Sequence, residues 1–350
     1  RMPYTHDVGG SSPLAPTIFY QLSSGCVMRI GITGANGFAG SNFANYFQSQ
    51  GYEVRGIVRP HADLSLLDPN LDIQFTDYNS QDELKRVLED VDVLIHNAGA
   101  VRTHTFMQMI EANVGTTRRV MEAFNHSSKG KRFIYISSQA ASHPSRDMEL
   151  AKEEDPSAPV DWYGKSKLLA EKIIKTECVK EWVIVRPCSI YGPGERDFYQ
   201  VFKAVQKGIN FHIGRKPQYM NLIYVRELVQ FLELCLTQKN AVGEIFFASD
   251  GEIYTQQDFM HLIAEILKVK TFEIAVPVPL AKTAFYAGEA FERITGKTTL
   301  LNKQKMKEIV DVTWLCSIEK AKRLLGWNPQ PNLREHLSET IQWYKEHNWL

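Results

Sequence analysis

Tyr163 and Lys167 form the strongest candidate in the sequence for moving a proton. A spacing of four residues places both side chains on one face of a helix, one turn apart. A free tyrosine has a pKa near 10, so about one in a thousand is ionised at pH 7, and a nearby ammonium favours the ionised form. Tyr163 can therefore exchange a proton with a substrate hydroxyl or carbonyl oxygen. Ser138, at the end of an apolar segment, is predicted to hold the same oxygen.

A glycine triplet near the start of the chain predicts a phosphate site. In the stretch RIGITGANGFAG, Gly34, Gly37 and Gly40 directly follow a strand-like alternation. Glycine permits a tight turn, close approach of backbone to a pyrophosphate, and close packing of helix on sheet. A helix beginning near Phe38 would supply free N–H groups and a partial positive charge for that anion. A glycine-rich turn without function is the alternative, and the proton-transfer candidates favour the phosphate site.

The end of the second predicted strand indicates which dinucleotide binds. An acidic residue there would accept the ribose hydroxyls of NAD, but the sequence has Arg59. A guanidinium suits a 2′-phosphate, and a charge-assisted hydrogen bond contributes roughly 1.5–3 kcal/mol. We therefore predict NADP(H), with NAD(H) as the alternative in which Arg59 is only a solvated cation. Two further strand ends, at Asp77 and at residues 96–100, are predicted to lie beside the adenine and along the dinucleotide.

Strand and helix signals alternate from Met28 onward, which predicts an α/β fold with a doubly wound parallel sheet. The predicted strands are Arg29–Thr33, Glu53–Val58, Ile73–Thr76, Val91–Asn97, Arg132–Ser137, Trp182–Arg186 and Glu244–Ser249. The predicted helices are Gly40–Gln50, Asp82–Glu89, Thr105–Asn125, Tyr163–Glu177, Phe198–Lys207, Gln256–Leu267 and Ala281–Ile294. We interpret the last of these helices as core and not as membrane-binding.

Glycine and proline interrupt the chain after Arg186 and indicate a smaller lobe interleaved with the sheet. We predict a dinucleotide-binding domain at 28–187 and 223–250. The predicted substrate lobe comprises 188–222 and 251–350. Residues 1–27 are interpreted as an extension outside the fold.

The composition of the chain limits which classes of binding partner are expected. The 40 basic and 40 acidic side chains cancel, so no global field favours nucleic acid or an anionic membrane. No apolar run approaches the roughly 18–20 residues that span a bilayer. The five cysteines are scattered, with no CxxC pair, which argues against a metal site or a disulfide framework and predicts a cytoplasmic location. The expected partner is a small-molecule substrate.

Taken together, the motifs resemble those of the extended short-chain dehydrogenases/reductases of the NAD(P)-dependent epimerase/dehydratase family, over essentially residues 28–350. They are TGANGFAG at 33–40, HNAG at 96–99, NVGT at 113–116, SS at 137–138, YGKSK at 163–167, RP at 186–187 and YGPG at 191–194. Lys320–Trp327 and Trp343-Tyr344 also resemble the closing helices of that family. The resemblance implies a Rossmann fold, and it implies a homodimer formed through helices 105–125 and 163–177.

Site residues follow from this resemblance. It implies catalytic roles for Ser138, Tyr163 and Lys167, with Asn113 supporting their geometry and Lys167 also binding the nicotinamide ribose. The implied cofactor-binding residues are Thr33, Gly34, Asn36, Gly37, Phe38, Gly40, Arg59, Asp77, Tyr78, Asn97, Ala98, Gly99, Lys167, Pro187 and Ser189. Candidate substrate contacts in the smaller lobe are Arg215, Tyr219, Asn221 and Tyr224.

Three functions remain open from the sequence. The stretch VRGIVRPHADLSLL resembles reductases that exchange NADPH at each turnover, as in dihydroflavonol-reductase-like members. The PGERDF and NLIYVREL segments also resemble sugar-modifying relatives, epimerases or dehydratases that recycle bound NAD. Some relatives are non-catalytic regulators, but these commonly lose the tyrosine or lysine that this chain keeps. The sequence therefore predicts an NAD(P)-dependent oxidoreductase acting on a secondary alcohol or ketone.

Overall fold

The computed structural model describes residues 28–145, 148–214, 216–296, 299, 302–310 and 312–350. The predicted extension at 1–27 and the candidate substrate residue Arg215 lie outside the described residues.

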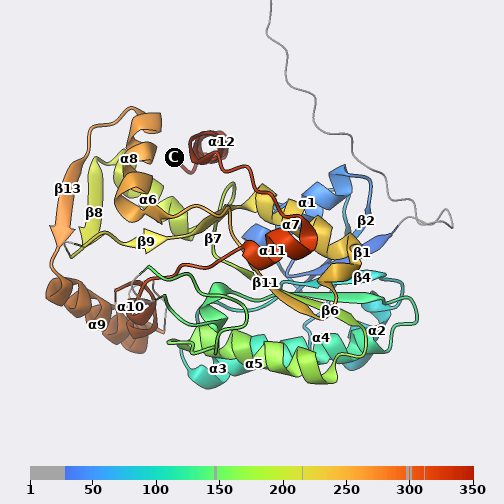
Figure 1. Cartoon of the computed structure of the whole chain (residues 1–350). Helices are drawn as coiled ribbons and strands as arrows, with labels where there is room; N and C mark the ends of the chain where they lie inside the picture. The colour runs from blue at the N-terminus through green and yellow to red at the C-terminus, as the bar shows by residue number, and fades with distance from the viewer. Residues whose placement is uncertain (1–27, 146–147, 215, 297–298, 300–301, 311) are drawn as a thin grey trace, which may run out of the picture.

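A seven-stranded parallel sheet forms the centre of the molecule (Figure 1), as the sequence predicted. Its strand order is β11-β6-β5-β4-β1-β2-β3. The chain leaves β1 toward one edge and returns at β4 toward the other, so the crossover direction reverses between β1 and β4. Ligands of such sheets bind at this switch point, beyond the carboxyl ends of the strands. The strands are β1 (Arg29–Thr33), β2 (Glu53–Val58), β3 (Asp72–Phe75), β4 (Val93–His96), β5 (Arg132–Ile136), β6 (Glu181–Pro187) and β11 (Glu244–Ala248).

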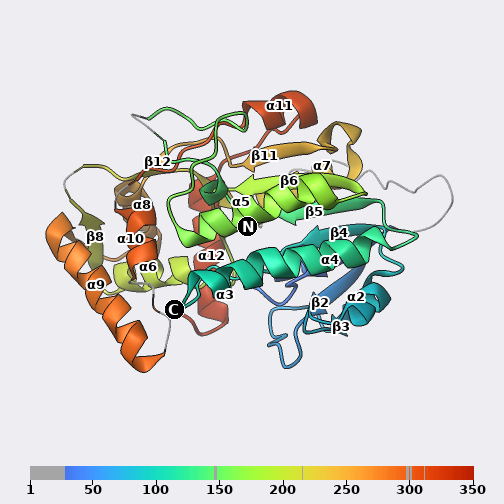
Figure 2. The same ribbon diagram turned by 90° about the horizontal axis from the view of Figure 1, so that it is seen from below.

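Helices cover both faces of the sheet (Figures 1 and 2). One face packs against α1, α7 and α11, and the other against α2, α4 and α5. All residues of β4 and β5 are buried, which explains why the apolar or aromatic residues at 93–95 and 133–136 follow one another without alternation. The covering helices are α1 (Phe38–Ser49), α2 (Gln81–Leu88), α3 (Phe106–Ile110), α4 (Thr116–Asn125), α5 (Trp162–Glu177), α7 (Val225–Thr237) and α11 (Glu319–Leu325).

The remaining elements build a second lobe beside the carboxyl ends of the strands (Figure 1). Its short strands pair with each other in twos: β7 with β10, β9 with β12, and β8 with β13. The strands are β7 (Ser189–Tyr191), β8 (Ile209–Ile213), β9 (Tyr219–Met220), β10 (Leu222–Tyr224), β12 (Tyr254–Thr255) and β13 (Phe272–Val276). The helices are α6 (Asp197–Gln206), α8 (Gln256–Leu267), α9 (Val278–Thr295), α10 (Lys303–Ile309) and α12 (Leu333–Glu346).

The interpretation of the helix at 281–294 as core is wrong for most of its surface. In α9 only Ala281 and Phe285 are buried among the large or apolar side chains described, whereas Leu280, Phe291 and Ile294 are exposed. The helix lies at the outer end of the second lobe in both views (Figures 1 and 2). Among the described residues, no helix combines the length and the apolar character needed to cross a membrane.

Candidate active site

A cleft of about 2500 Å³ separates the carboxyl ends of the sheet from the second lobe. It brings together half of the site residues predicted from the sequence, although they come from six different segments. Those that line it are Asn36, Gly37, Phe38, Asn97, Gly99, Ser138, Tyr163, Lys167, Pro187, Ser189 and Tyr219. No cluster of metal-binding side chains occurs within the part of the chain that the structure describes.

The glycine loop is shaped to receive an anion. Gly34 has φ +66°, and a Cβ there would lie 2.9 Å from the Ala98 Cα. A Cβ on Gly40 would lie 2.2 Å from the Gly34 carbonyl oxygen, so only glycine allows α1 to start this close to β1. Gly37 caps α1 without any side-chain hydrogen bond, and the first turn holds no acidic residue. The helix N-terminus therefore offers its N–H groups to the cleft, which fits the pyrophosphate of a dinucleotide.

Three of the predicted cofactor residues support this loop from behind and do not line the cleft. Tyr78 is buried, and its hydroxyl donates to the Ile57 carbonyl at 2.8 Å and accepts from the Gly34 N–H at 3.2 Å. Burial is the main reason that its pKa is raised to about 12. Ala98 packs against Gly34. Thr33 is fully buried, and its Oγ1 accepts from the N–H groups that follow β4.

A buried chain of hydrogen bonds joins the glycine loop to the helical segment behind the cleft. Thr117 donates its hydroxyl proton to the Asn113 carbonyl at 2.5 Å. The His96 Nε2, 2.9 Å from Thr117 Oγ1, must therefore be the protonated ring nitrogen, and Nδ1 accepts from Thr33 Oγ1 at 2.7 Å. Burial lowers the pKa of His96 to about 3, which keeps the ring neutral. His96, the last residue of β4, thus connects the end of β1 to the start of α4, a role the sequence did not suggest.

Tyr163 and Lys167 both lie on the first turns of α5, as predicted. The Lys167 Nζ is 5.9 Å from the centre of the Tyr163 ring and donates to the Ile136 carbonyl at 2.8 Å. Burial lowers the pKa of Lys167 to about 8, and the negative charge of Glu171 acts against this lowering. Lys167 therefore remains mainly a cation at neutral pH. This cation, next to Tyr163 in the same cleft, is the arrangement that favours an ionised phenol.

Asn113 acts on this pair through other groups. The predicted helix 105–125 is interrupted by a π-helical turn at Glu111–Gly115, which holds Asn113 in the interior. Its Oδ1 accepts from the Ala100 N–H at 2.7 Å, and its Nδ2 donates to Ser166 Oγ at 2.8 Å. Ser166 in turn donates to the Tyr163 carbonyl at 2.7 Å. Asn113 therefore positions both the loop after β4 and the start of α5, and it is a positioning residue.

Gly164 sets the approach of α5 to Ser138, a role that sequence reasoning missed. Ser138 begins a single 3₁₀ turn, Gln139–Ala141, and lines the cleft there. A Cβ on Gly164 would lie 2.0 Å from the Ala140 carbonyl oxygen, far inside van der Waals contact. The absence of a side chain at Gly164 is thus what allows Tyr163 to lie beside Ser138 in one cleft.

Gly164→Ala is expected to lower turnover by about a hundredfold or more, since shifts near 1 Å in catalytic groups have effects of that size. We also expect about 1–3 kcal/mol of destabilisation from overpacking. Steady-state rates and urea unfolding measure both. The control is Gly115→Ala, where the atoms nearest the new Cβ belong to the carboxylate of Glu111, an exposed side chain that pairs with Arg119 and can move at the cost of that surface ion pair. Equal effects of the two substitutions would contradict the role assigned to Gly164.

A buried ion pair connects the strand ends beneath the site. Arg186, near the end of β6, bonds Glu171 of α5 through two nitrogens, at 2.9 and 2.6 Å. Ser137 donates to the same carboxylate at 2.5 Å. Both charged side chains are almost completely buried. The network fixes β5, β6 and α5 relative to each other and thereby places Ser138 and Lys167. The RP motif at 186–187 singled out Arg186 in the sequence, whereas no sequence motif singled out its partner Glu171.

Two residues predicted to contact the substrate do not line the cleft. Tyr224 is buried, stacked on His336, with its hydroxyl donating to Glu339 at 2.6 Å, so the expected substrate contact is wrong. Asn221 is also buried and bonds backbone groups of Glu252 and Cys316, which corrects the same expectation. The side chains of Tyr224 and Asn221 therefore hold the second lobe together.

Two predicted cofactor residues lie at exposed strand ends. Arg59 follows β2 directly and is exposed. The carboxylate of Asp77, beyond β3, accepts from the Asn79 N–H at 2.7 Å, and this backbone hydrogen bond is the main reason for its lowered pKa. Arg55, earlier in β2, is engaged by Asp72 and Asp90 and is therefore not available to a cofactor.

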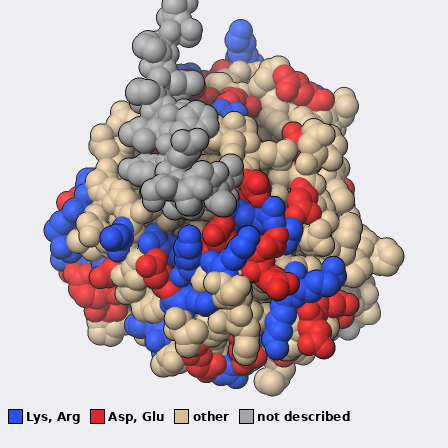
Figure 3. Space-filling model, turned by 90° about the vertical axis from the view of Figure 1, so that its right-hand side faces the viewer, with Lys and Arg blue, Asp and Glu red and all other residues tan. Residues whose placement is uncertain are grey.

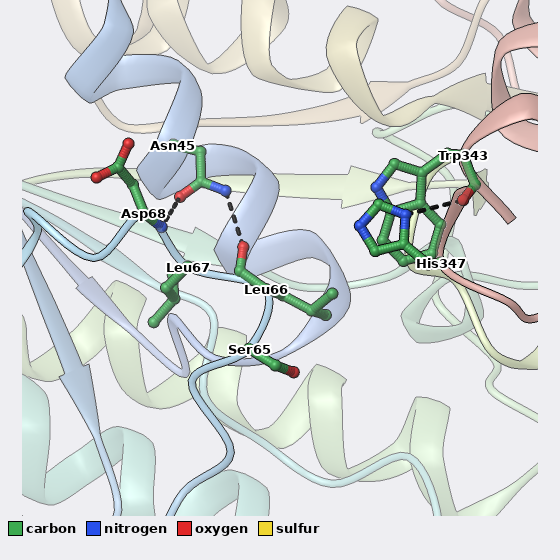
Figure 4. A pocket seen from close by; sticks show the side chains of 7 residues that line it. All are labelled: Asn45, Ser65, Leu66, Leu67, Asp68, Trp343 and His347. Atoms are coloured by element: carbon green, nitrogen blue, oxygen red, sulfur yellow. Dashed lines mark hydrogen bonds between the residues drawn. The ribbon is translucent and has the colours of Figure 1, made fainter.

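A second, smaller pocket of about 340 Å³ lies between α1, the segment after β2, and α12 (Figure 4). Asn45 donates to the Leu66 carbonyl at 2.8 Å and accepts from the Asp68 N–H at 2.9 Å. Trp343 and His347 stack on the other side, with ring centres 3.8 Å apart. Because Leu66 also lines the main cleft, the role of Asn45 here is to hold that wall of the cleft in place.

Comparison with known proteins agrees with this fold and cleft. Residues 30–248 match the model of the NAD dependent epimerase/dehydratase family, and the chain belongs to that family. It is an NAD(P)-dependent enzyme of the extended short-chain dehydrogenase/reductase type, as the motifs predicted.

Individual relatives differ in their reactions. The chain is 28% identical over 334 residues to UDP-glucose 4-epimerase of Vibrio cholerae, covering 91% of this chain and 95% of that protein. It is 25% identical over 324 residues to ceramide reductase of Caulobacter vibrioides, covering 92% and 96%. The structure of UDP-glucuronic acid 4-epimerase from Bacillus cereus, in complex with UDP-glucuronic acid and NAD, superposes with a TM-score of 0.73 at 23% identity. The superposition covers 91% of this chain and 100% of that one, and it confirms the Rossmann fold.

Proposed function

We propose that this protein is an NADP(H)-dependent reductase or dehydrogenase that interconverts a ketone and a secondary alcohol on a largely apolar molecule. The observation that carries the substrate class is the second-lobe wall of the cleft. Apolar side chains dominate that wall: Phe211, Ile213, Met220, Val276, Phe285 and Trp314. An aliphatic or fused-ring substrate would gain from burial against this wall. The ceramide reductase among the relatives acts, by its name, on a substrate of this class.

The reaction we propose uses three side chains of the cleft. A bound nicotinamide cofactor supplies or accepts the hydride. Tyr163 donates a proton to the carbonyl oxygen during reduction and accepts it back during oxidation. Ser138 holds that oxygen by a hydrogen bond. The buried ammonium of Lys167, 5.9 Å from the centre of the Tyr163 ring, stabilises negative charge on the Tyr163 oxygen and binds the nicotinamide ribose. Pro187, at the end of β6, and Ser189, at the start of β7, lie in the cleft wall and flank the ring.

The cofactor preference is tested by binding. We expect NADPH to bind at least about tenfold more tightly than NADH, because one charge-assisted hydrogen bond from Arg59 to a 2′-phosphate is worth roughly 1.5–3 kcal/mol. Arg59→Asp should abolish or reverse the preference. Fluorescence titration of both cofactors measures it, with Arg226→Asp, an exposed arginine of α7 outside the cleft, as the control. Tight NADH binding without preference would contradict the role of Arg59.

A nucleotide-sugar epimerase is the second candidate, and a specific observation favours it. Arg196 and Lys216 lie in the same cleft and suit a diphosphate. The two reactions differ in cofactor consumption: a reductase oxidises NADPH in proportion to product, whereas an epimerase has no net consumption. NADPH oxidation with a long-chain aliphatic ketone, measured beside conversion of UDP-glucose, separates them.

The proposed homodimer rests on the resemblance and on one arrangement. The segments predicted to pair between subunits, α3–α4 and α5, lie side by side on one outer face of the molecule (Figure 2).

A further inference from the structure

An exposed apolar surface lies at the outer end of the second lobe. Among the described residues, 15 large apolar side chains are exposed, and more than half of them come from β8, β13 and α9. Ile294 is 85% exposed and Phe272 is 80% exposed. Leaving out Val278, which also lines the cleft, we call the others the α9 face: Ile209, Phe272, Ile274, Leu280, Tyr286, Phe291 and Ile294. Apolar patches of this kind on soluble proteins mark interaction surfaces.

The apolar residues of α9 form two stripes. Leu280, Phe291 and Ile294 are separated by eleven and three residues, which places them along one outer side of the helix. The buried Ala281 and Phe285 occupy the other side and line the cleft. The helix is therefore at once a wall of the cleft and an outer surface of the molecule, so whatever covers the outer stripe lies one helix away from the substrate site.

Charge around this face indicates the occupant. The whole chain is balanced, yet the charged side chains that the structure describes within residues 268–308 are six Lys against three Glu. On the side of the molecule turned away from α9, positive and negative side chains are intermingled (Figure 3). Apolar side chains on a basic segment are the combination that binds an anionic lipid surface. A second copy of this chain would bring the same basic excess to the face and be repelled.

We propose that the α9 face is a docking surface for an anionic lipid bilayer. The apolar side chains of β13 and α9 insert at the level of the headgroups, and described lysines of the same part of the chain, such as the exposed Lys268 and Lys270 that precede β13, meet the lipid charge. Docked this way, the cleft opens next to the bilayer. The prediction of no membrane partner rested on global charge and on the lack of a spanning segment, and neither property bears on binding at the surface of a bilayer.

Flotation of the full chain with vesicles tests the proposal directly. We expect binding to vesicles of phosphatidylcholine mixed with phosphatidylglycerol, weaker binding to pure phosphatidylcholine, and loss of binding as NaCl is raised. Ile294→Glu and Phe272→Glu, on two different elements, should each lower the partition coefficient at least about tenfold. The control is Val179→Glu, because Val179 is 76% exposed but lies after α5, away from the α9 face. It should bind as the unchanged protein does.

Two results would overturn the proposal. One is an absence of flotation with the mixed vesicles, or equal losses from all three substitutions. The other is a protein that does not float and that light scattering shows to be a dimer, if Ile294→Glu dissociates that dimer. A second copy of the chain would then occupy the α9 face. The proposal is independent of the proposed function, since flotation needs neither cofactor nor substrate. Failure of NADPH oxidation with a soluble ketone would contradict only the proposed function.

Discussion

Tyr163→Phe is expected to lower turnover by about a hundredfold to ten-thousandfold, the usual contribution of a positioned proton donor. The substitution removes one hydroxyl and keeps the ring that packs near the Lys167 ammonium. Cofactor binding should change by no more than about twofold, because the interaction lost belongs to the reacting oxygen. Steady-state rates together with the fluorescence titration of NADPH measure the two effects separately.

The matched control is Tyr46→Phe. Tyr46 is a half-buried tyrosine of α1 that does not line the cleft, so the loss of its hydroxyl should leave turnover unchanged. If Tyr163→Phe kept nearly full turnover, proton transfer through Tyr163 would be ruled out. If the unsubstituted protein bound cofactor but turned over no substrate, the result would favour a non-catalytic regulator, one of the three functions left open by the sequence.

Glu171→Ala is expected to destabilise the fold by about 3–5 kcal/mol, the effect of removing one partner of a buried ion pair. The Arg186 guanidinium would remain buried without its carboxylate, and its Nη1 already has no hydrogen-bond partner within the described structure. Ser137 would lose its acceptor as well. Urea unfolding measures the free-energy change. Glu171→Gln keeps the shape and loses only the charge, so it should fold with a smaller loss of stability if the alanine variant does not fold.

Glu177→Ala on the same helix is the control for the ion pair. Glu177 pairs with Arg118 at 2.9 Å, but both side chains are exposed, and such pairs contribute about 0.2–1 kcal/mol. The difference between the two glutamates would measure the effect of burial alone. Losses of similar size at Glu171 and Glu177 would show that the buried network does not hold the strand ends together.

Most of the sheet was predictable because its signals are local. The seven strands and the helices between them follow from apolar runs and from periodicity, and β1, β2 and α8 agree to the residue with the predicted bounds. The short strands β7 to β10, β12 and β13 were missed, since each is stabilised by a partner distant in the chain. The break in helix 105–125 was missed for a related reason. Its π-helical turn is explained by the contacts of Asn113 with Ala100 and Ser166.

The sequence by itself determined the class of chemistry: the glycine triplet, Ser138 and the Tyr163–Lys167 pair are defined by residue type and spacing. Only the tertiary structure decided which predicted residues reach the cleft. Tyr219 does and Tyr224 does not, because the two tyrosines belong to different strands. Tyr219 begins β9, which pairs with β12, whereas Tyr224 ends β10, which pairs with β7 and carries the Tyr224 ring onto His336. It also decided that α9 faces outward. A helix with apolar residues on two sides has the same sequence pattern whether both sides are covered or only one.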